Sequence, residues 1–304
     1  MVVASVESPQ ASYQSVLLGC LSGSTIWIDF EAHGASSLAV RVLSLGSGSS
    51  GNALLIAAEG CNLLVDCGVG SRTIAASLKT LGFGWDQLSG VVISHEHSDH
   101  IRALDPIVRR KIPIHCSKGT AIGAGLGPSS YSQLHFDRSF QIDAATIHPI
   151  PTSHDASEPC GYFIEVAGFG VSVITDTGEA GAHFLEPIRN SQLAVFESNH
   201  DEQMLWNGPY PAHLKRRVAS PRGHLSNKAC GDTLRMALAD GARPAVWLAH
   251  LSETNNRPDL ALKTVRAQLG EMGRTLEIEA LSRRGGIQRS LTPEEPRPRQ
   301  LSLL

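Results

Sequence analysis

The chain has 304 residues, of which 42% are hydrophobic and 18% charged, with a formal net charge of -3. This length allows one large domain or two smaller ones, and it can bury a core without disulfides or a structural metal. The charge excludes a generally basic nucleic-acid-coating protein, although local basic clusters can still contact phosphates. The six cysteines form no CxxC pair and no apolar run is long enough to cross a bilayer, so we expect a cytoplasmic protein.

Composition divides the chain into three parts. Residues 1–39 lack Lys and Arg and are rich in Ser and Ala, which predicts a poorly ordered N-terminal extension. Residues 287–304 are rich in Pro and charge, which predicts a loose C-terminal tail. One folded domain is therefore predicted for residues 40–286.

The domain begins with three hydrophobic stretches, 40–46, 53–60 and 61–68, which predict consecutive strands. A helix is predicted for 71–82, then a buried strand in 88–97, and then a helix for 101–111. Further strands are predicted for 146–154, 161–168, 170–178, 193–200 and 244–252, and further helices for 227–241 and 258–273. This order of strands and helices indicates stacked α and β layers.

The stretch that links the first two strands contains Gly46, Gly48 and Gly51 in the spacing GxGxxG. A dinucleotide-binding loop with this spacing passes from a strand into a helix, whose N-terminus holds the pyrophosphate. Here Gly51 leads into another predicted strand, so we interpret the match as accidental. Glycines in such a loop instead let the backbone approach a neighbouring site closely.

The strongest chemical signal is the sequence SHEHSDH, which follows the buried strand. Residues two apart in an extended segment point the same way, so His95 and His97 can reach one ion together. Asp99 and His100 lie where the chain turns toward a helix, and they can face a second ion. Imidazole and carboxylate groups suit zinc, and also manganese or iron. The alternative, a solvated polar turn, leaves the apolar strand before the motif unexplained.

The order of these motifs resembles the metallo-β-lactamase superfamily over about residues 41–285. The resemblance implies an α/β fold with four αββα layers, in which two mixed β-sheets are flanked by helices. It also implies that Asp66 supports the metal-binding loop, and that His154 is a ligand in preference to its rival His148. The implied ligands are His95, His97 and His154 for one ion and Asp99, His100 and His250 for the other, with Asp176 between them.

The stretches ESNHD and GHLSN further resemble the YycJ/VicX (WalJ) family of bacterial proteins, which are associated with nuclease activity. The arrangement is also similar to tRNA 3′-processing nucleases, which carry a Glu at the end of one strand and a His in a GHST-like loop. Glu197 and His224 match these two residues. This implies that His224 acts as a general acid toward the leaving alkoxide, with Glu197 orienting its ring. Asp99, His224 and Glu197 are thus the predicted catalytic residues, whereas His200 and Asp201 receive no role.

A basic cluster lies close to His224 in the sequence. We expect Arg216, Arg217 and Arg222 to hold phosphates that flank the scissile bond. The alternative is a solvated helix face.

Taken with the resemblance, the sequence predicts a phosphodiesterase that uses two divalent metal ions, zinc or manganese, and a metal-bridging hydroxide. Nucleic acid, and specifically DNA degraded by an exonuclease, is the predicted substrate. One alternative is a small-molecule hydrolase such as a cyclic phosphodiesterase, lactonase or thioesterase, and another is a non-enzymatic metal-binding regulatory module. The metal, the polarity of cleavage and the oligomeric state stay open.

Overall fold

The computed structural model describes residues 39–292, whose strands form two sheets of seven strands each. The first sheet has the order β14-β1-β2-β3-β4-β5-β6 and the second the order β13-β12-β11-β10-β9-β8-β7. The strands of the first sheet are β1 (Val40–Gly46), β2 (Ala53–Ala58), β3 (Cys61–Val65), β4 (Gly90–Val92), β5 (Ile114–Cys116), β6 (Ser132–Gln133) and β14 (Gln288–Leu291). Those of the second are β7 (Phe140–Ile142), β8 (Ala145–Pro151), β9 (Cys160–Val166), β10 (Phe169–Ile174), β11 (Leu193–Glu197), β12 (Ala245–Ala249) and β13 (Ile278–Ala280).

Both sheets are mixed, with an antiparallel half and a parallel half. Neighbours from β14 to β3 pair antiparallel and neighbours from β3 to β6 pair parallel. The second sheet repeats this arrangement, antiparallel from β7 to β10 and parallel from β10 to β13. Parallel neighbours need crossover connections, and these supply the helices that cover the sheets.

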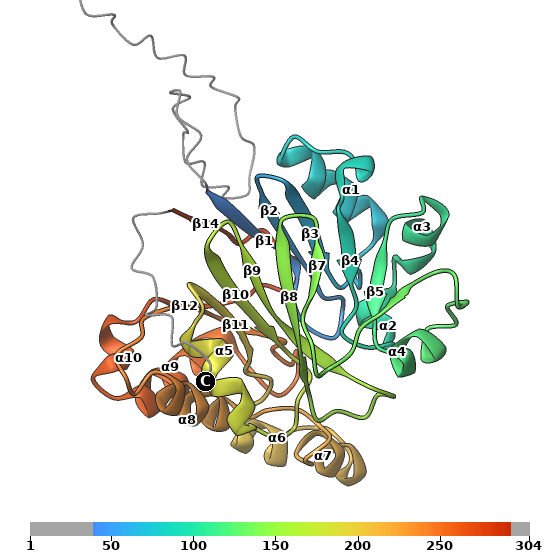
Figure 1. Cartoon of the computed structure of the whole chain (residues 1–304). Coiled ribbons are helices and arrows are strands. Elements are labelled where there is room, and N and C mark those ends of the chain that lie inside the picture. The colour runs from blue at the N-terminus through green and yellow to red at the C-terminus, as the bar shows by residue number, and fades with distance from the viewer. Residues whose placement is uncertain (1–38, 293–304) are drawn as a thin grey trace, which may run out of the picture. The chain divides into compact units, whose positions relative to one another are not determined.

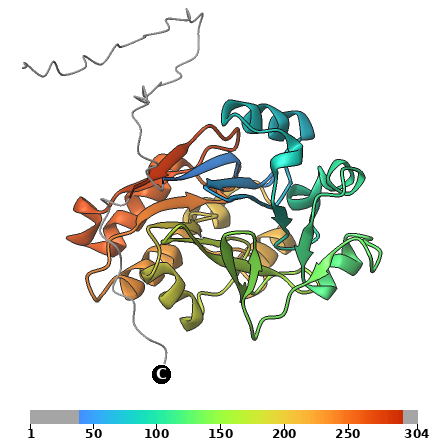
Figure 2. The same ribbon diagram turned by 45° about the horizontal axis from the view of Figure 1, so that its top comes forward.

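The helices are α1 (Ser71–Thr80), η1 (Trp85–Gln87), α2 (Ser98–Ile101), α3 (Leu104–Arg109), α4 (Lys118–Gly123), η2 (Ala182–Phe184), α5 (Leu185–Arg189), α6 (Glu202–Asn207), α7 (Ala212–Val218), α8 (Asn227–Ala237), α9 (Pro258–Leu269) and α10 (Met272–Thr275). Figure 1 and Figure 2 show α1 and α3 on one flank of the sheets and the helices of the C-terminal half on the other. No helix of residues 39–292 is both long and apolar enough to span a bilayer.

Three hydrophobic clusters confirm the predicted four layers. One lies between the sheets, where the fully buried Tyr162 of β9 donates a hydrogen bond of 2.6 Å to the carbonyl of Ile93 after β4. A second lies between the first sheet and α1, α3 and α4, and a third between the second sheet and α5, α8 and α9. The sandwich is therefore held by apolar contacts on both faces of each sheet.

The helix predicted for 101–111 is shorter in the structure, where α3 covers Leu104–Arg109 and the separate helix α2 ends at Ile101. Pro106 lacks the amide hydrogen that a continuous helix would use and its ring clashes with the preceding turn. The chain breaks at Ala103, which has φ -99° and ψ 22°. The amide of Ala103 instead donates to the carbonyl of Cys67 at 2.8 Å, which ties the break to the strand end after β3.

The C-terminal boundary also differs from the prediction. Strand β14 lies inside the stretch predicted to be a loose tail, and it pairs antiparallel with β1 from Gln288 to Leu291. These residues thus belong to the first sheet, and the predicted domain end at 286 is too early. The rest of that stretch, 293–304, and the predicted extension up to residue 38 lie outside the described residues.

Candidate metal centre

The predicted site residues come from strand ends that meet at one edge of the sandwich. Because parallel strands share a direction, side chains that follow their carboxyl ends are brought together. Asp66 follows β3, His95 follows β4, His154 follows β8, Asp176 follows β10, Glu197 ends β11 and His250 follows β12.

The first group consists of His95, His97 and His154, each of which has a ring nitrogen within 4.8 Å of one in the others. The Nδ1 of His154 lies 2.9 Å from the carbonyl of Gly223, and the Nδ1 of His95 lies 3.0 Å from the hydroxyl of Ser94. These contacts hold the rings by one nitrogen and leave Nε2 for the site. Burial lowers the pKa of His95 well below its usual range, so its ring is neutral and has a free lone pair.

The second group consists of Asp99, His100 and His250. Asp99 Oδ2 lies 3.7 Å from Nε2 of His100 and 3.5 Å from Nε2 of His250. Behind His100, Asp66 accepts from the Nδ1 at 2.8 Å and from the backbone amide of Ser94 at 2.7 Å. Asp66 therefore bridges the ring of His100 and the backbone of Ser94.

Asp176 lies between the two groups. Its carboxylate oxygens are 3.2 Å from Nε2 of His100, 3.8 Å from Nε2 of His154 and 3.5 Å from Nδ1 of His250. Burial alone would raise the pKa of Asp176, but the charges of His250 and His100 outweigh it and hold that pKa well below its usual range. Conversely, burial lowers the pKa of His100, and the carboxylates of Asp176 and Asp66 overcome this and raise it to about 10.

These donors fit divalent cations. Nε2 of His95, Nε2 of His250 and Oδ2 of Asp176 are buried without a hydrogen-bond partner. Buried polar atoms normally have partners, so ring nitrogens and a carboxylate oxygen left unpartnered around one space suit a bound cation. Nitrogen and carboxylate oxygen together suit zinc or manganese. The clusters are thus compatible with metal binding.

His224 and Glu197 form a pair beside these groups. His224 Nδ1 lies 2.8 Å from Oε1 of the fully buried Glu197 and 3.6 Å from Oδ1 of Asp176. The other oxygen of Glu197 accepts from the backbone amide of Thr177 at 2.7 Å. Burial raises the pKa of Glu197, but His224 outweighs it and the pKa is lowered, so the pair is held as donor and carboxylate.

Four polar residues that the sequence analysis did not single out also support the site. The amide Nδ2 of Asn52 lies 3.0 Å from Nε2 of His100 and 3.2 Å from Oδ2 of Asp99. The hydroxyl of Ser47 accepts from the backbone amide of His250 at 2.8 Å. The other two are Ser94, described above, and Asn199, whose Nδ2 donates to the carbonyl of His250 at 2.8 Å. Asn52 and Ser47 lie in the glycine-rich loop between β1 and β2. The glycines of this loop were the sequence signal that could have pointed to these two residues.

The glycines of this region act by close approach, as the sequence suggested. A Cβ on Gly68 would lie 1.6 Å from the carbonyl oxygen of Asp99, and one on Gly51 would lie 2.6 Å from that of Gly68. The loop therefore packs backbone against backbone behind the metal-binding motif, and it joins two strands rather than a strand and a helix.

Three further polar residues considered from the sequence, Asp201, His200 and His148, lie outside the candidate metal-binding groups of the described residues. Asp201 caps α6, because its side chain accepts from the amide of Met204 at 2.9 Å. His200 is buried close to Glu197, and burial lowers its pKa to about 4. His148 pairs with Glu165 at 2.7 Å on an exposed part of the second sheet, and it is absent from the metal-binding groups of the described residues.

The three predicted phosphate-binding arginines lie on or just after α7. Arg216 is exposed, and so is Arg222, whose Nε donates to the carbonyl of His154 at 3.2 Å. Arg217 forms an ion pair with Asp155, with Nη2 at 2.6 Å from Oδ2. The structure thus brings Arg217 and Arg222 to the turn that carries His154.

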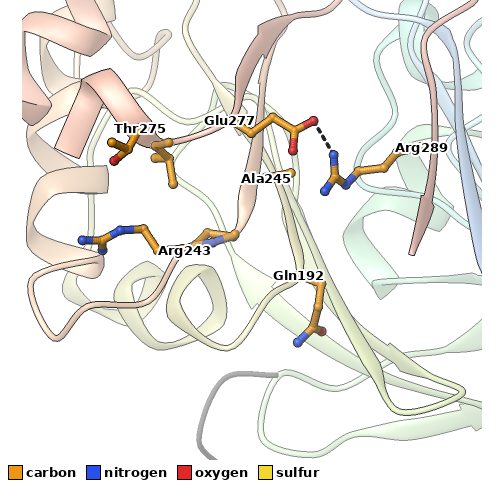
Figure 3. Close-up of a pocket in the computed structure, with 8 residues that line it drawn as sticks. Gln192, Arg243, Ala245, Thr275, Glu277 and Arg289 are labelled. Carbon is orange, nitrogen blue, oxygen red and sulfur yellow. Dashed lines mark hydrogen bonds and ion pairs between the residues drawn. The ribbon is translucent and has the colours of Figure 1, made fainter. Parts of the chain in front are cut away.

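A separate hollow of about 380 Å³ lies at the opposite ends of the strands. Gln192 and Ala245, at the starts of β11 and β12, line it together with the ion pair of Arg289 and Glu277, which Figure 3 shows. The metal-binding groups of the described residues lie at the other ends of these strands. We therefore place the chemistry at the histidine clusters and not in this hollow.

Comparison with known proteins identifies the class of protein to which the chain belongs. The model of the beta-lactamase superfamily domain matches residues 61–250. The crystal structure of the metallo-beta-lactamase fold protein YhfI from Bacillus subtilis superposes with a TM-score of 0.62 at 20% identity, covering 83% of this chain and 99% of that one. The chain is therefore a metal-dependent hydrolase of this superfamily.

Two curated relatives define the family within that class. Exodeoxyribonuclease YycJ of Bacillus anthracis is 34% identical over 238 residues, which cover 75% of this chain and 89% of the relative. Exodeoxyribonuclease WalJ of Streptococcus pneumoniae is 29% identical over 244 residues, which cover 78% and 90%. The chain belongs to the YycJ/WalJ family.

Proposed function

We propose that the chain is a phosphodiesterase with two divalent metal ions that degrades DNA as an exonuclease. The pair of His224 and Glu197 beside Asp176 carries this proposal, because a phosphodiester releases an alkoxide that needs a proton. The names of the curated relatives support DNA as the substrate. The described cysteines are all free and buried, which supports the cytoplasm as the compartment.

The predicted ligands form two groups, one for each metal ion. We assign His95, His97 and His154 to one ion, and Asp99, His100 and His250 to the other, with Asp176 shared and Asp66 behind His100. Zinc or manganese ions held there would activate water as the nucleophile and neutralise the charge that develops on the phosphate.

The residues around the ions handle protons and position. Glu197 accepts the hydrogen at Nδ1 of His224, so Nε2 is the atom that transfers a proton to the leaving oxygen. Asp99 is held by Asn52 at 3.2 Å and helps to orient the nucleophilic water. Arg216 and Arg222 contact the flanking phosphates. Arg217 can do so only by giving up its ion pair with Asp155.

A digestion experiment tests this function. Protein loaded with zinc or manganese is incubated with end-labelled single-stranded and double-stranded DNA, beside the His97→Ala variant. Progressive shortening by the wild type alone is the expected result, and the position of the label gives the polarity. Absence of DNA cleavage with either metal, together with turnover of a small chromogenic diester or a thioester, would indicate a small-molecule hydrolase instead.

The basic cluster gives the same experiment a second arm. Replacing both Arg216 and Arg222 by Glu should lower kcat/KM on long DNA at least tenfold and spare the small diester, since repulsion acts on flanking phosphates only. Arg243→Glu is the control at a distant position, because Arg243 is also exposed but lines the hollow at the far ends of the strands. Equal losses in both variants would remove the phosphate role.

A further inference from the structure

The turn after β8 brings one more carboxylate to the three-histidine group. Asp155 Oδ1 lies 3.3 Å from Nε2 of His154 and 4.0 Å from Nε2 of His97. This oxygen is buried and has no hydrogen-bond partner. Neither the motif resemblance nor the spacing of the ligands pointed to Asp155.

The contact between Asp155 and His154 needs a positive charge between the two atoms. Nδ1 of His154 lies 2.9 Å from the carbonyl of Gly223, which only accepts, so Nδ1 carries the hydrogen of the neutral ring. Nε2 then presents a lone pair toward Asp155 Oδ1, and two acceptors at 3.3 Å repel each other. Nε2 of His95, in the same group, is buried without a partner as well. Oδ1 of Asp155 lies near Nε2 of both His154 and His97, so one cation shared by these three atoms would neutralise the contact.

The carboxylate is held in this orientation from outside. Nε and Nη2 of Arg217 lie 2.7 and 2.6 Å from Oδ2 of Asp155, the oxygen that faces away from His154. On the other side of the turn, Ser157 donates from its amide and its hydroxyl to Oε1 of Glu96 at 2.8 and 2.7 Å. Glu96 stands between His95 and His97 in the sequence, so the turn is fixed to the metal-binding motif itself. Such fixed partners are typical of residues that present a ligand to a metal.

We propose that Asp155 is a further ligand of the ion held by His95, His97 and His154, and that Arg217 positions its carboxylate. The inference rests on the metal site of the proposed function but not on its substrate. It gives Arg217 a different task from its exposed neighbour Arg216, for which no ion pair is present in the described part of the chain.

Metal titration of the full chain tests the proposal without reference to activity. Metal-free protein is titrated with zinc against a chromogenic chelator at fixed pH, for the wild type and for Asp155→Asn, Arg217→Ala and Arg216→Ala. We expect Asp155→Asn to bind one ion about 10- to 100-fold more weakly. Arg217→Ala should weaken the same ion by a smaller factor, and Arg216→Ala should match the wild type. Cobalt substitution should show a changed visible absorption spectrum in Asp155→Asn only.

Equal zinc affinities in Asp155→Asn and wild type would overturn the proposal. If Asp155→Asn does not fold, which thermal melting of the metal-free protein reveals, the comparison of Arg217→Ala with Arg216→Ala decides, and equal affinities there overturn it. DNA digestion by the wild type is scored separately. A wild type that binds both ions but cleaves no DNA would remove the proposed substrate and leave the assignment of Asp155 intact.

Discussion

The histidines of the site use their two ring nitrogens for different purposes. Nδ1 of His100 contacts Asp66 at 2.8 Å and Nδ1 of His154 contacts the carbonyl of Gly223 at 2.9 Å. Each contact holds the ring by Nδ1 and leaves Nε2 pointing toward the site. The orientation of these rings is thus set by Asp66 and by the backbone of Gly223.

The His224→Ala variant separates a proton donor from a ligand. It should keep its full metal content and lose about 10²–10⁴-fold in turnover, because the leaving oxygen then lacks its proton source. Metal analysis and single-turnover kinetics on DNA measure the two quantities. His148→Ala, on the exposed part of the second sheet, should change neither. Loss of an ion from His224→Ala would instead make His224 a ligand, which its position near Asp176 and His250 also allows.

The buried His200 gives a pH dependence of stability. Burial lowers its pKa from 6.5 to about 4, so the unfolded chain binds a proton between these values that the folded chain does not. His200 therefore contributes stability above pH 6.5, and the contribution is lost as the pH falls toward 4. Between pH 7 and 5 this loss is about 2 kcal/mol.

Urea unfolding of metal-free wild type and His200→Asn at pH 7 and 5 measures this effect. The free energy of unfolding should fall less in the variant, by about 2 kcal/mol, since Asn does not titrate. Parallel decreases in the two proteins would show that His200 is not buried as a neutral ring.

At the scale of elements, the strand ends carry an unusual backbone. Asp66, Asp176 and His250 have positive φ of 59°, 57° and 56°, although none of them is glycine. Such conformations cost about 1–3 kcal/mol each and persist where surrounding contacts hold them. All three residues lie within two positions of the ends of β3, β10 and β12, and their side chains contact the histidines or carboxylates of the clusters. The strain lies at the residues on which the site depends.

Gly68 lets the loop after β3 approach the metal-binding motif. Gly68→Ala should destabilise the fold by more than about 2 kcal/mol and lower the metal content, because its Cβ would meet the carbonyl of Asp99 at 1.6 Å. Gly70→Ala is the matched control, since a Cβ there has no atom within 4 Å. It should cost no more than about 1 kcal/mol as a helix N-cap change. Chemical denaturation and metal analysis compare the variants, and equal stabilities would refute the close-packing account.

At the scale of the whole molecule, the sequence predicted the features that depend on residues close together in the chain. Strand periodicity and the SHEHSDH motif, read with the family resemblance, predicted the αββα layers and the cluster of ligands. The pairing of β14 with β1 was missed, because its four mixed-polarity residues have no strand signal without their distant partner. The ion pair of Asp155 and Arg217 was missed for the same reason, since 62 positions separate the two in the chain. The glycine-rich loop marked the position of Asn52, but an amide in such a loop has many ordinary roles, so its contacts with Asp99 and His100 were not predicted.

The two sheets together build the centre, so its metal content is a property of the whole sandwich. Each predicted group combines ligands that follow β4 with ligands that follow β8 or β12 of the other sheet. We therefore expect two metal sites, and substitution of a ligand in one group should empty only the site to which that group belongs.

Metal analysis of the purified chain measures this most directly. The wild type should hold about two divalent ions, and His97→Ala and His250→Ala should each hold about one, while His148→Ala keeps both. A wild type with one ion or none, or either ligand variant retaining two, would contradict the account.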